Sequence, residues 1–175
     1  MNKPLYYFLL LLVLSFNKAE SQENFKLDSS NTQITFNARH FRVLKVEGTF
    51  RKFSGQLVLE GNIVTSGSLV IQVASIDTDN ESRDKSLKSE DFLNANSFPQ
   101  IRISFESNTH PTVITTYTKI KAVTQILQLN YEIIESNKLE VKFTISRKKF
   151  NLDFGTMDDL VSNEIKVEGI VSLSP

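Results

Sequence analysis

Hydrophobic and polar residues alternate along most of this chain with a period of two, which is typical of β-strands that bury one face. The first clear run places Ile34, Phe36 and Ala38 on one face, with polar residues between them. The same pattern predicts further buried faces made of Ile101, Ile103 and Phe105; of Leu127, Leu129, Tyr131 and Ile133; of Leu139, Val141, Phe143 and Ile145; of Phe150, Leu152 and Phe154; and of Ile165, Val167, Gly169, Val171 and Leu173. We therefore expect about nine or ten short antiparallel strands.

Clusters of glycine, proline, serine and asparagine separate these runs and set the expected boundaries. On this basis, further strands are expected at residues 45–53, 56–60, 68–76, 115–124 and 126–134. A sheet with this many strands either closes into a barrel or splits into two packed layers. An eight-stranded closed sheet is just wide enough inside to hold one small ligand.

Residues 83–93 do not alternate, and they are rich in charge. Their apolar residues stand at a short helical spacing, and Asp79 or Asn80 can cap a helix that begins near Glu81. We predict one short helical insertion here, at a fixed corner of the barrel mouth.

The first residues have the features of a secretory signal peptide. Lys3 precedes an apolar run over residues 5–16, and small residues follow near a cleavage site after Ser21. We therefore predict that residues 1–21 are removed and that residues 22–175 form one exported domain, periplasmic or secreted. The competing interpretation is an uncleaved anchor, but the apolar run is shorter than the roughly 20 residues that a spanning helix needs. No stable membrane span is expected.

Composition narrows the possible partners of the exported domain. Removal of the signal peptide takes two of the 20 basic and one of the 20 acidic residues, which leaves a formal charge near −1. This balance does not attract nucleic acid or an anionic membrane. The chain has no cysteine, so a thiolate metal site, a cysteine nucleophile and a lipoprotein anchor are excluded. Its 13 phenylalanines supply apolar area for an interior.

Residues suited to catalysis or metal binding are sparse. His40 and His110 are far apart in the sequence and belong to no HExxH pattern. A serine triad needs a histidine with an orienting acid, and the chain has no Gly-x-Ser-x-Gly elbow. The neighbouring carboxylates Asp158 and Asp159 lie in a polar segment that we expect to be a solvated loop. We predict no enzyme activity, no metal and no cofactor.

Two blocks of the sequence resemble the YceI-like family of exported lipid- or polyisoprenoid-binding barrels. In the first block, residues 31–40 form a strand that ends in a histidine, and a Gly-x-Phe strand (46–50) and a Phe-x-Gly turn (53–55) follow. The second block comprises residues 74–78 and 83–99. The resemblance extends over essentially the whole exported domain.

The resemblance implies a lipocalin-like barrel that holds a long apolar chain, such as a polyprenyl or quinone tail, without known catalytic residues. Combined with the alternation, it predicts an all-β fold, an extended antiparallel lipocalin-like β-barrel with one short helical insertion. The stretch between Asn130 and Ile145 is shorter than is usual in the family, which bears on the depth of the cavity.

The inward side chains are expected to line a ligand cavity. The predicted ligand-binding residues are Phe36, Ala38, His40, Phe50, Ile71, Val73, Phe92, Ile103, Phe105, Leu129, Tyr131, Phe143 and Ile145. The predicted polar residues at its mouth are Arg39, Arg83, Asp84 and Arg147. Arg39 or His40 would meet a phosphate or quinone oxygen of a ligand, whereas Arg83 is expected to form an internal pair with Asp84 or another carboxylate, which holds the helical insertion to the barrel rim.

The resulting hypothesis is an exported lipid-binding protein that encloses an isoprenoid-type chain, polyprenyl or quinone-like, for transport or storage. The alternative is an exported, non-catalytic structural or protein-interaction module on the same fold, with a core filled by side chains. The expected partner is an isoprenoid or another long-chain lipid and not nucleic acid. The oligomeric state stays open and includes a homodimer.

Overall fold

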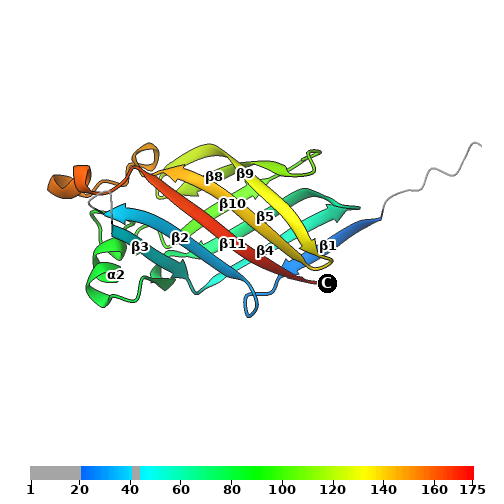
Figure 1. Ribbon diagram of the computed structural model, residues 1–175, viewed down its shortest axis with the longest axis horizontal. Coiled ribbons are helices and arrows are strands. Elements are labelled where there is room, and N and C mark those ends of the chain that lie inside the picture. Colours follow the sequence, from blue (N-terminus) through cyan, green and yellow to red (C-terminus); the bar gives the residue numbers. More distant parts are fainter. Residues whose placement is uncertain (1–20, 41–43) are drawn as a thin grey trace, which may run out of the picture.

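The computed structural model describes residues 21–40 and 44–175, and within them the chain forms one antiparallel sheet, the helix α2 and three short 3-10 helices (Figure 1). The strands are β1 (Gln22–Leu27), β2 (Gln33–His40), β3 (Leu44–Phe50), β4 (Phe53–Glu60), β5 (Ile63–Gln72), β6 (Ile76–Asp77), β7 (Gln100–Phe105), β8 (Val113–Ile120), β9 (Val123–Glu135), β10 (Lys138–Ser146) and β11 (Glu164–Ser174). The helices are η2 (Val73–Ser75), α2 (Glu81–Lys88), η3 (Arg147–Phe150) and η4 (Gly155–Leu160). The predicted signal peptide, Ser21 apart, lies outside the described residues.

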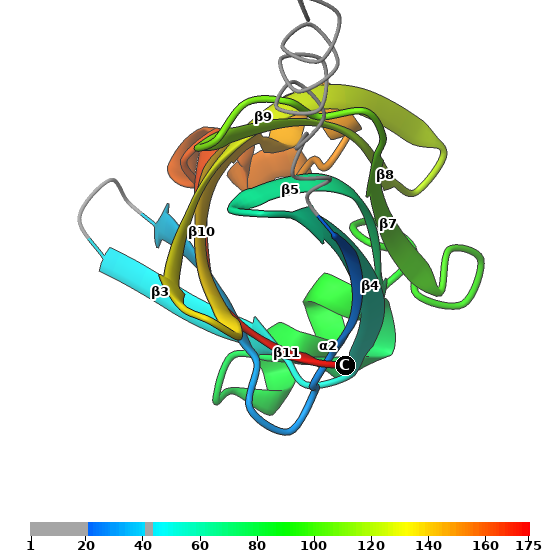
Figure 2. The same cartoon turned by 90° about the vertical axis from the view of Figure 1, so that its right-hand side faces the viewer.

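Eight of the eleven strands close into a barrel, which Figure 2 shows in a view along its long axis. Their order around the ring is β1-β4-β5-β7-β8-β9-β10-β11. Strand β1 completes the ring by pairing with β11, where Lys26 lies opposite Ser174 and Leu27 opposite Leu173. The predicted all-β antiparallel barrel with one short helical insertion is therefore confirmed. The remaining strands β2, β3 and β6 extend the sheet beyond the ring from the edge of β11.

Strand β11 pairs with two successive strands along one edge. Its residues 166–170 pair with β2, and its last residues pair with β1. The turn between β1 and β2 is held at Ser172, whose backbone N–H donates to Thr32 Oγ1 at 2.9 Å and whose hydroxyl donates to the carbonyl oxygen of Asn31 at 2.9 Å. Because Thr32 and Ser172 are buried, these hydrogen bonds are shielded from water and stabilise the closing seam of the barrel.

Helix α2 follows the short strand β6, at the end of the barrel away from the C-terminus (Figure 1). Asn80 caps the helix, because its side-chain oxygen accepts a hydrogen bond from the backbone N–H of Arg83 at 2.9 Å. Leu87 on the helix, and Phe92 and Leu93 just after it, are buried in the core. The predicted helix, with its start near Glu81 and its cap, is confirmed.

The hydrophobic core has two parts along the barrel. The part near the C-terminus consists of Leu59, Val64, Phe105, Ile114, Tyr131, Leu139, Val171 and Leu173. The other part combines strand residues with the buried side chains after α2 and with Phe150 and Leu152 near η3. The inward sets predicted from the alternation thus contribute to one or the other part.

The strand predicted over residues 150–154 is wrong. The chain forms η3, turns at Asn151 in the left-handed region (φ 55°), and stays irregular until η4. Phe150 and Leu152 are nevertheless fully buried, at 0% and 2% exposure. The alternation of these residues therefore reflects burial on both sides of a turn and does not indicate a strand.

Several strand boundaries also differ from expectation. Strand β3 ends at Phe50 and β4 begins at Phe53, where one strand over 45–53 was expected, and β5 spans Ile63–Gln72 and not 68–76. The turn between β8 and β9 lies at Lys121 and Ala122, with Lys121 in the left-handed region (φ 53°), and β9 begins at Val123. The expected break at residue 125 was wrong because β-branched Val123 and Thr124 fit a strand as well as a turn. No strand was predicted over residues 22–27, where β1 lies, because these six residues bury little and show weak alternation.

Candidate ligand-binding cavity

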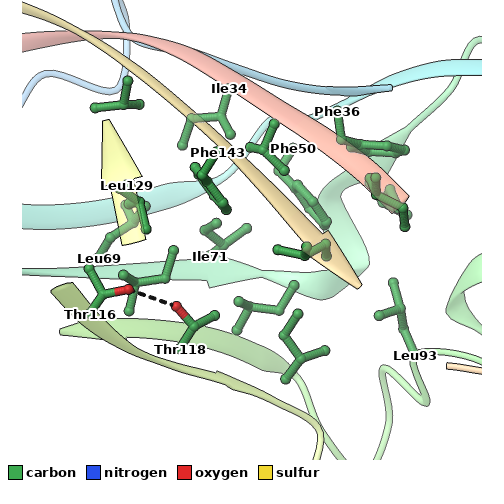
Figure 3. Close-up of a pocket in the computed structure, with 18 of the residues that line it drawn as sticks. Ile34, Phe36, Phe50, Leu69, Ile71, Leu93, Thr116, Thr118, Leu129 and Phe143 are labelled. Atoms are coloured by element: carbon green, nitrogen blue, oxygen red, sulfur yellow. Dashed lines mark hydrogen bonds between the residues drawn. The ribbon is translucent and has the colours of Figure 1, made fainter. Parts of the chain in front are cut away.

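The barrel encloses a cavity of about 500 Å³, a volume within the usual range for small-molecule sites. Every strand of the closed ring contributes side chains to its wall, and β2, β3 and α2 add others at one end. The wall is almost entirely aliphatic and aromatic, and no carboxylate of residues 21–40 and 44–175 lines it (Figure 3). Such a surface binds by the removal of apolar area from water.

Several large side chains that point into the barrel are only half-buried. Phe36, Phe50 and Phe143 belong to this group, and Figure 3 shows them directed into the cavity from different strands. Phe36 and Phe50 lie together, with ring centroids 5.7 Å apart, and do not fill the axis. Gly48 stands opposite Phe36 on β3, where a Cβ atom would overlap the Phe36 ring. The interior is therefore hollow and is not a core filled by side chains.

The cavity opens at the end of the barrel that carries α2. Of the residues that line it, Arg39 and Ser86 are exposed to solvent, and both belong to this end. At the other end, the Tyr131 hydroxyl accepts a hydrogen bond from the backbone N–H of Val64 at 3.2 Å and donates to the carbonyl oxygen of His110 at 3.0 Å. Tyr131 therefore ties the loop before β8 across the buried end.

Arg83 and Asp84 meet at Thr78. The Arg83 guanidinium donates to Thr78 Oγ1 at 2.8 Å and to the Thr78 carbonyl oxygen at 2.6 Å. Asp84 Oδ1 accepts from the backbone N–H of Thr78 at 3.0 Å and from its hydroxyl at 2.6 Å. Both side chains are described, and no ion pair joins them directly, so the expected direct pair is wrong. Thr78 instead links both of them to the end of β6, where they hold α2 against the rim.

Arg147 is fully buried, and each of its five N–H donors has an acceptor. It donates to the carbonyl oxygens of Leu152, Asp158, Val161 and Ser162, and to the carboxylate of Asp158. This single side chain therefore organises the segment from η3 to β11. Its guanidinium also lies over the Phe154 ring, 5.3 Å from the centroid.

Two expectations about this segment need correction. Arg147 does not line the mouth, and Asp158 is not a solvated carboxylate, because the two form an ion pair; Asp159 and most of the residues around it are exposed as expected. Lys148 adds a second ion pair to Asp158 at 2.8 Å. The hydrogen bonds from Arg147 and then from Lys148 hold the pKa of Asp158 well below its usual range.

Most of the predicted binding residues lie on the cavity wall. These are Phe36, Ala38, Phe50, Ile71, Phe92, Ile103, Phe105, Leu129, Tyr131, Phe143 and Ile145, with Arg39 and Arg83 near the mouth. Val73 is buried in the core and not on the wall, because η2 begins there and interrupts the alternation of β5. Asp84 and Arg147 are not on the wall either, for the reasons above, and the side chain of His40 lies outside the described part of the chain. That these residues bind a ligand stays a prediction.

Sequence reasoning missed Thr116 and Thr118, two buried residues of the wall. They alternate with Ile114 and Ile120 on the inward face of β8. The period of two was therefore present in the sequence, but threonines in a run of threonines give no hydrophobic signal.

In residues 21–40 and 44–175, no group of three or more His, Cys, Asp or Glu side chains is arranged to hold a metal ion. The helices of the same residues include none with the length and hydropathy to cross a membrane.

Comparison with known proteins identifies the family of the chain. Residues 25–172 match the sequence profile of the YceI-like domain. A UPF0312 protein of Staphylococcus aureus (strain bovine RF122 / ET3-1) is 28% identical over 169 residues, which cover 86% of this chain and 97% of that protein.

Two solved structures share the fold. Burkholderia cenocepacia BcnA superposes with a TM-score of 0.73 at 19% identity, over 85% of this chain and 99% of BcnA. A polyisoprenoid-binding domain from Saccharophagus degradans, implicated in plant cell wall breakdown, superposes with a TM-score of 0.68 at 14% identity, over 86% of this chain and 97% of that domain. At these identities the likeness establishes the shared architecture.

The Arg147–Asp158 pair predicts how stability depends on pH. Because folding lowers the pKa of Asp158 from 3.8, the ion pair stabilises the fold above about pH 4 and this contribution is lost as the pH falls below it. Asp158→Asn should lower the melting temperature at pH 7, and the difference from the native chain should shrink between pH 4 and lower pH. Thermal unfolding followed by circular dichroism across this range measures both effects. Asp159→Asn, at the exposed neighbouring position, is the control, and equal pH profiles for the native chain and Asp158→Asn would contradict the assignment.

Proposed function

Because the chain belongs to the YceI-like family and its barrel encloses an apolar cavity, we propose that it is a non-catalytic binding protein that encloses the apolar chain of a lipid. The cavity is the observation that carries this proposal. Its wall offers apolar contact over its whole length and presents no nucleophile beside a base. Transport or storage of the enclosed lipid follows from such a site.

The size of the cavity limits the length of chain that it encloses. A volume of about 500 Å³ accommodates roughly 16 groups of the size of a water molecule, at about 30 Å³ each. At about 0.8 kcal/mol per methylene group, transfer of such a chain from water contributes about 13 kcal/mol before the costs of ordering the ligand. Micromolar binding requires about 8 kcal/mol, so apolar contacts alone reach this affinity when the ordering costs stay below about 5 kcal/mol. A longer tail would extend through the mouth.

We propose an isoprenoid-type chain, polyprenyl or quinone-like, as the ligand class. The fold shared with the polyisoprenoid-binding domain of Saccharophagus degradans supports this choice. Branched methyl groups along such a chain suit a wall built from isoleucine, valine, leucine and phenylalanine, which is irregular at the scale of one methyl group.

Arg39 is the residue proposed to meet the polar head of the ligand. Its side chain is exposed and lines the cavity at the mouth. Its backbone is held by Ser162, which donates from its N–H to the Arg39 carbonyl oxygen at 2.8 Å and accepts from the Arg39 N–H at 3.1 Å. Arg83 also reaches the wall but directs two of its donors to Thr78.

Export is part of the same proposal and rests on the apolar run that follows Lys3. The mature protein should begin at Gln22, at the periplasmic or extracellular side of the membrane. Amino-terminal sequencing of protein recovered from its native host measures this directly. A chain that retains residues 1–21 in full would contradict cleavage.

Blocking the cavity should abolish lipid binding without unfolding the barrel. Ala38 lines the cavity near the mouth and is half-buried, so the indole ring of Ala38→Trp would occupy space that a ligand needs. We expect the native chain to yield bound lipid on organic extraction and mass spectrometry, and Ala38→Trp to bind at least about tenfold less. Ala122→Trp, at the exposed turn between β8 and β9, is the matched control and should bind as the native chain does. If the native chain neither yields lipid nor binds an added long-chain lipid, the proposed function is wrong.

Arg39 should govern the preference for a phosphorylated head group. In Arg39→Gln the affinity for a prenyl phosphate should fall roughly tenfold to a hundredfold, as expected for one charge-assisted hydrogen bond, while the affinity for the corresponding alcohol stays the same. Competition with a fluorescent lipid measures both affinities. Arg102→Gln, on the outward face of β7, should change neither affinity. A parallel loss for the phosphate and the alcohol in Arg39→Gln would assign Arg39 to packing and not to the head group.

A further inference from the structure

The wall of the cavity contains two hydroxyl groups that an apolar chain does not require. Thr116 and Thr118 lie on the inward face of β8, with side chains 0% and 2% exposed. Their Oγ1 atoms are 3.1 Å apart and form a hydrogen bond, drawn in Figure 3. In this view the pair lies beside Leu69 and far from Leu93, which follows α2 at the mouth. The two hydroxyls therefore lie well inside the barrel.

Hydrogen-bond accounting shows that the pair keeps unused capacity. Each hydroxyl has one proton to donate and two lone pairs that accept. Thr116 Oγ1 also lies 3.4 Å from the carbonyl oxygen of Leu127. If Thr116 donates to Leu127, Thr118 donates to Thr116 and keeps both of its own lone pairs. If Thr116 donates to Thr118, the proton of Thr118 is unused.

Neighbouring polar groups are already committed elsewhere. Across the strand pair from Thr118, the side chain of Gln125 donates to the carbonyl oxygen of Lys149 at 3.0 Å. The hydroxyl of Tyr131 both donates and accepts within the protein. Among the buried polar side chains that the structure places on the wall, Thr118 thus keeps the most unused hydrogen-bonding capacity.

The surroundings also determine which polar group fits there. A buried hydroxyl is unfavourable unless it is hydrogen-bonded, and valine would fill the same volume without that requirement. The cationic side chains on the described wall, Arg39 and Arg83, are at the mouth, so an anion at the threonines would have no compensating charge. A neutral oxygen meets both conditions, since it can pair with Thr118 and can be buried without a counter-ion.

We propose that Thr116 and Thr118 form a specificity site for a neutral hydroxyl group, carried by the enclosed part of the ligand, which can donate to the unused lone pairs of Thr118. This inference rests on the proposed lipid-binding function and adds to it. Apolar contacts hold the chain, and the hydroxyl pair selects a chain with an oxygen at the matching depth. Thr118 contacts the ligand oxygen, and Thr116 orients Thr118.

The test compares two ligands that differ in one atom group. One is a secondary alcohol of roughly 16 heavy atoms, chosen to fit the cavity. The other is its isostere, in which a methyl group replaces the hydroxyl group. The native chain should bind the alcohol roughly fivefold to tenfold more tightly, the effect expected of one neutral hydrogen bond. Both affinities are measured by displacement of a fluorescent long-chain probe.

The preference should depend on the two hydroxyls. The double variant Thr116→Val with Thr118→Val should lose the preference or reverse it, because a buried hydroxyl without a partner is unfavourable. Thr118→Ser should keep the preference, because serine retains the hydroxyl. Thr115→Val is the matched control, since it makes the same change on the exposed face of β8 and should leave the preference intact. Thermal unfolding of each variant establishes that it is folded.

Three results would overturn the inference. One is an equal affinity of the native chain for the two ligands, and another is a preference that survives in the double variant. If the double variant does not fold, loss of the preference in Thr118→Ser would have the same meaning. Binding of the isostere with no advantage for the alcohol contradicts this inference alone, whereas failure of the native chain to bind either ligand contradicts the proposed function as well.

Discussion

The pairing of β1 with β11 is the constraint on which the cavity depends. Without this seam, the strands would form an open sheet with one apolar face, and such a face must be covered by another layer. With it, eight strands enclose an interior whose width is fixed by the ring. The hydrogen bonds around Ser172 hold the seam from inside the protein. Closure of the ring therefore turns the apolar face of the sheet into the wall of the cavity.

Polar contacts shape the open end of this cavity. Thr78 fixes Arg83 and Asp84 at the start of α2, and Arg147 fixes the segment from η3 to β11. The two segments meet where Phe92 stacks on Phe154, with ring centroids 4.3 Å apart. Both rings lie on the cavity wall. The buried guanidinium of Arg147 thus acts on the mouth indirectly, by placing the loop that carries Phe154.

The fold and the wall could be predicted from the sequence because they rest on local periodicity. A period of two identifies the inward side chains of a strand whatever its neighbours are, so Phe36, Ile103 and Phe143 were placed on the wall correctly. The method failed where burial and strand structure separate. Phe150 is buried in a 3-10 turn, and Val73 begins another. The backbone N–H groups of Val73 and Arg147 there donate to the carbonyl oxygens of the distant residues Pro99 and Asn163.

The polar partners could not be predicted for a related reason. Arg147 and Asp158 are eleven positions apart, and their contact depends on a loop that no short-range rule describes. Adjacent Arg83 and Asp84 suggested a direct pair, but successive residues of a helix project in different directions, and Thr78 lies where both can reach it. Sequence proximity is therefore a poor guide to polar contacts, although it is a good guide to the faces of strands.

An apolar wall contributes affinity, but it does little to fix the position of a ligand along the cavity. Each methylene group gains about the same free energy wherever it lies along the cavity, so a hydrocarbon chain could slide without large cost. Directional groups are required to fix its depth. The wall has few, namely arginine side chains at the mouth and the threonine pair further inside. Threonine is β-branched and suits a strand as well as valine does, so a hydroxyl can be introduced into such a wall with little cost to the backbone. In a barrel of this kind, ligand choice can therefore change through single inward positions while the fold stays the same.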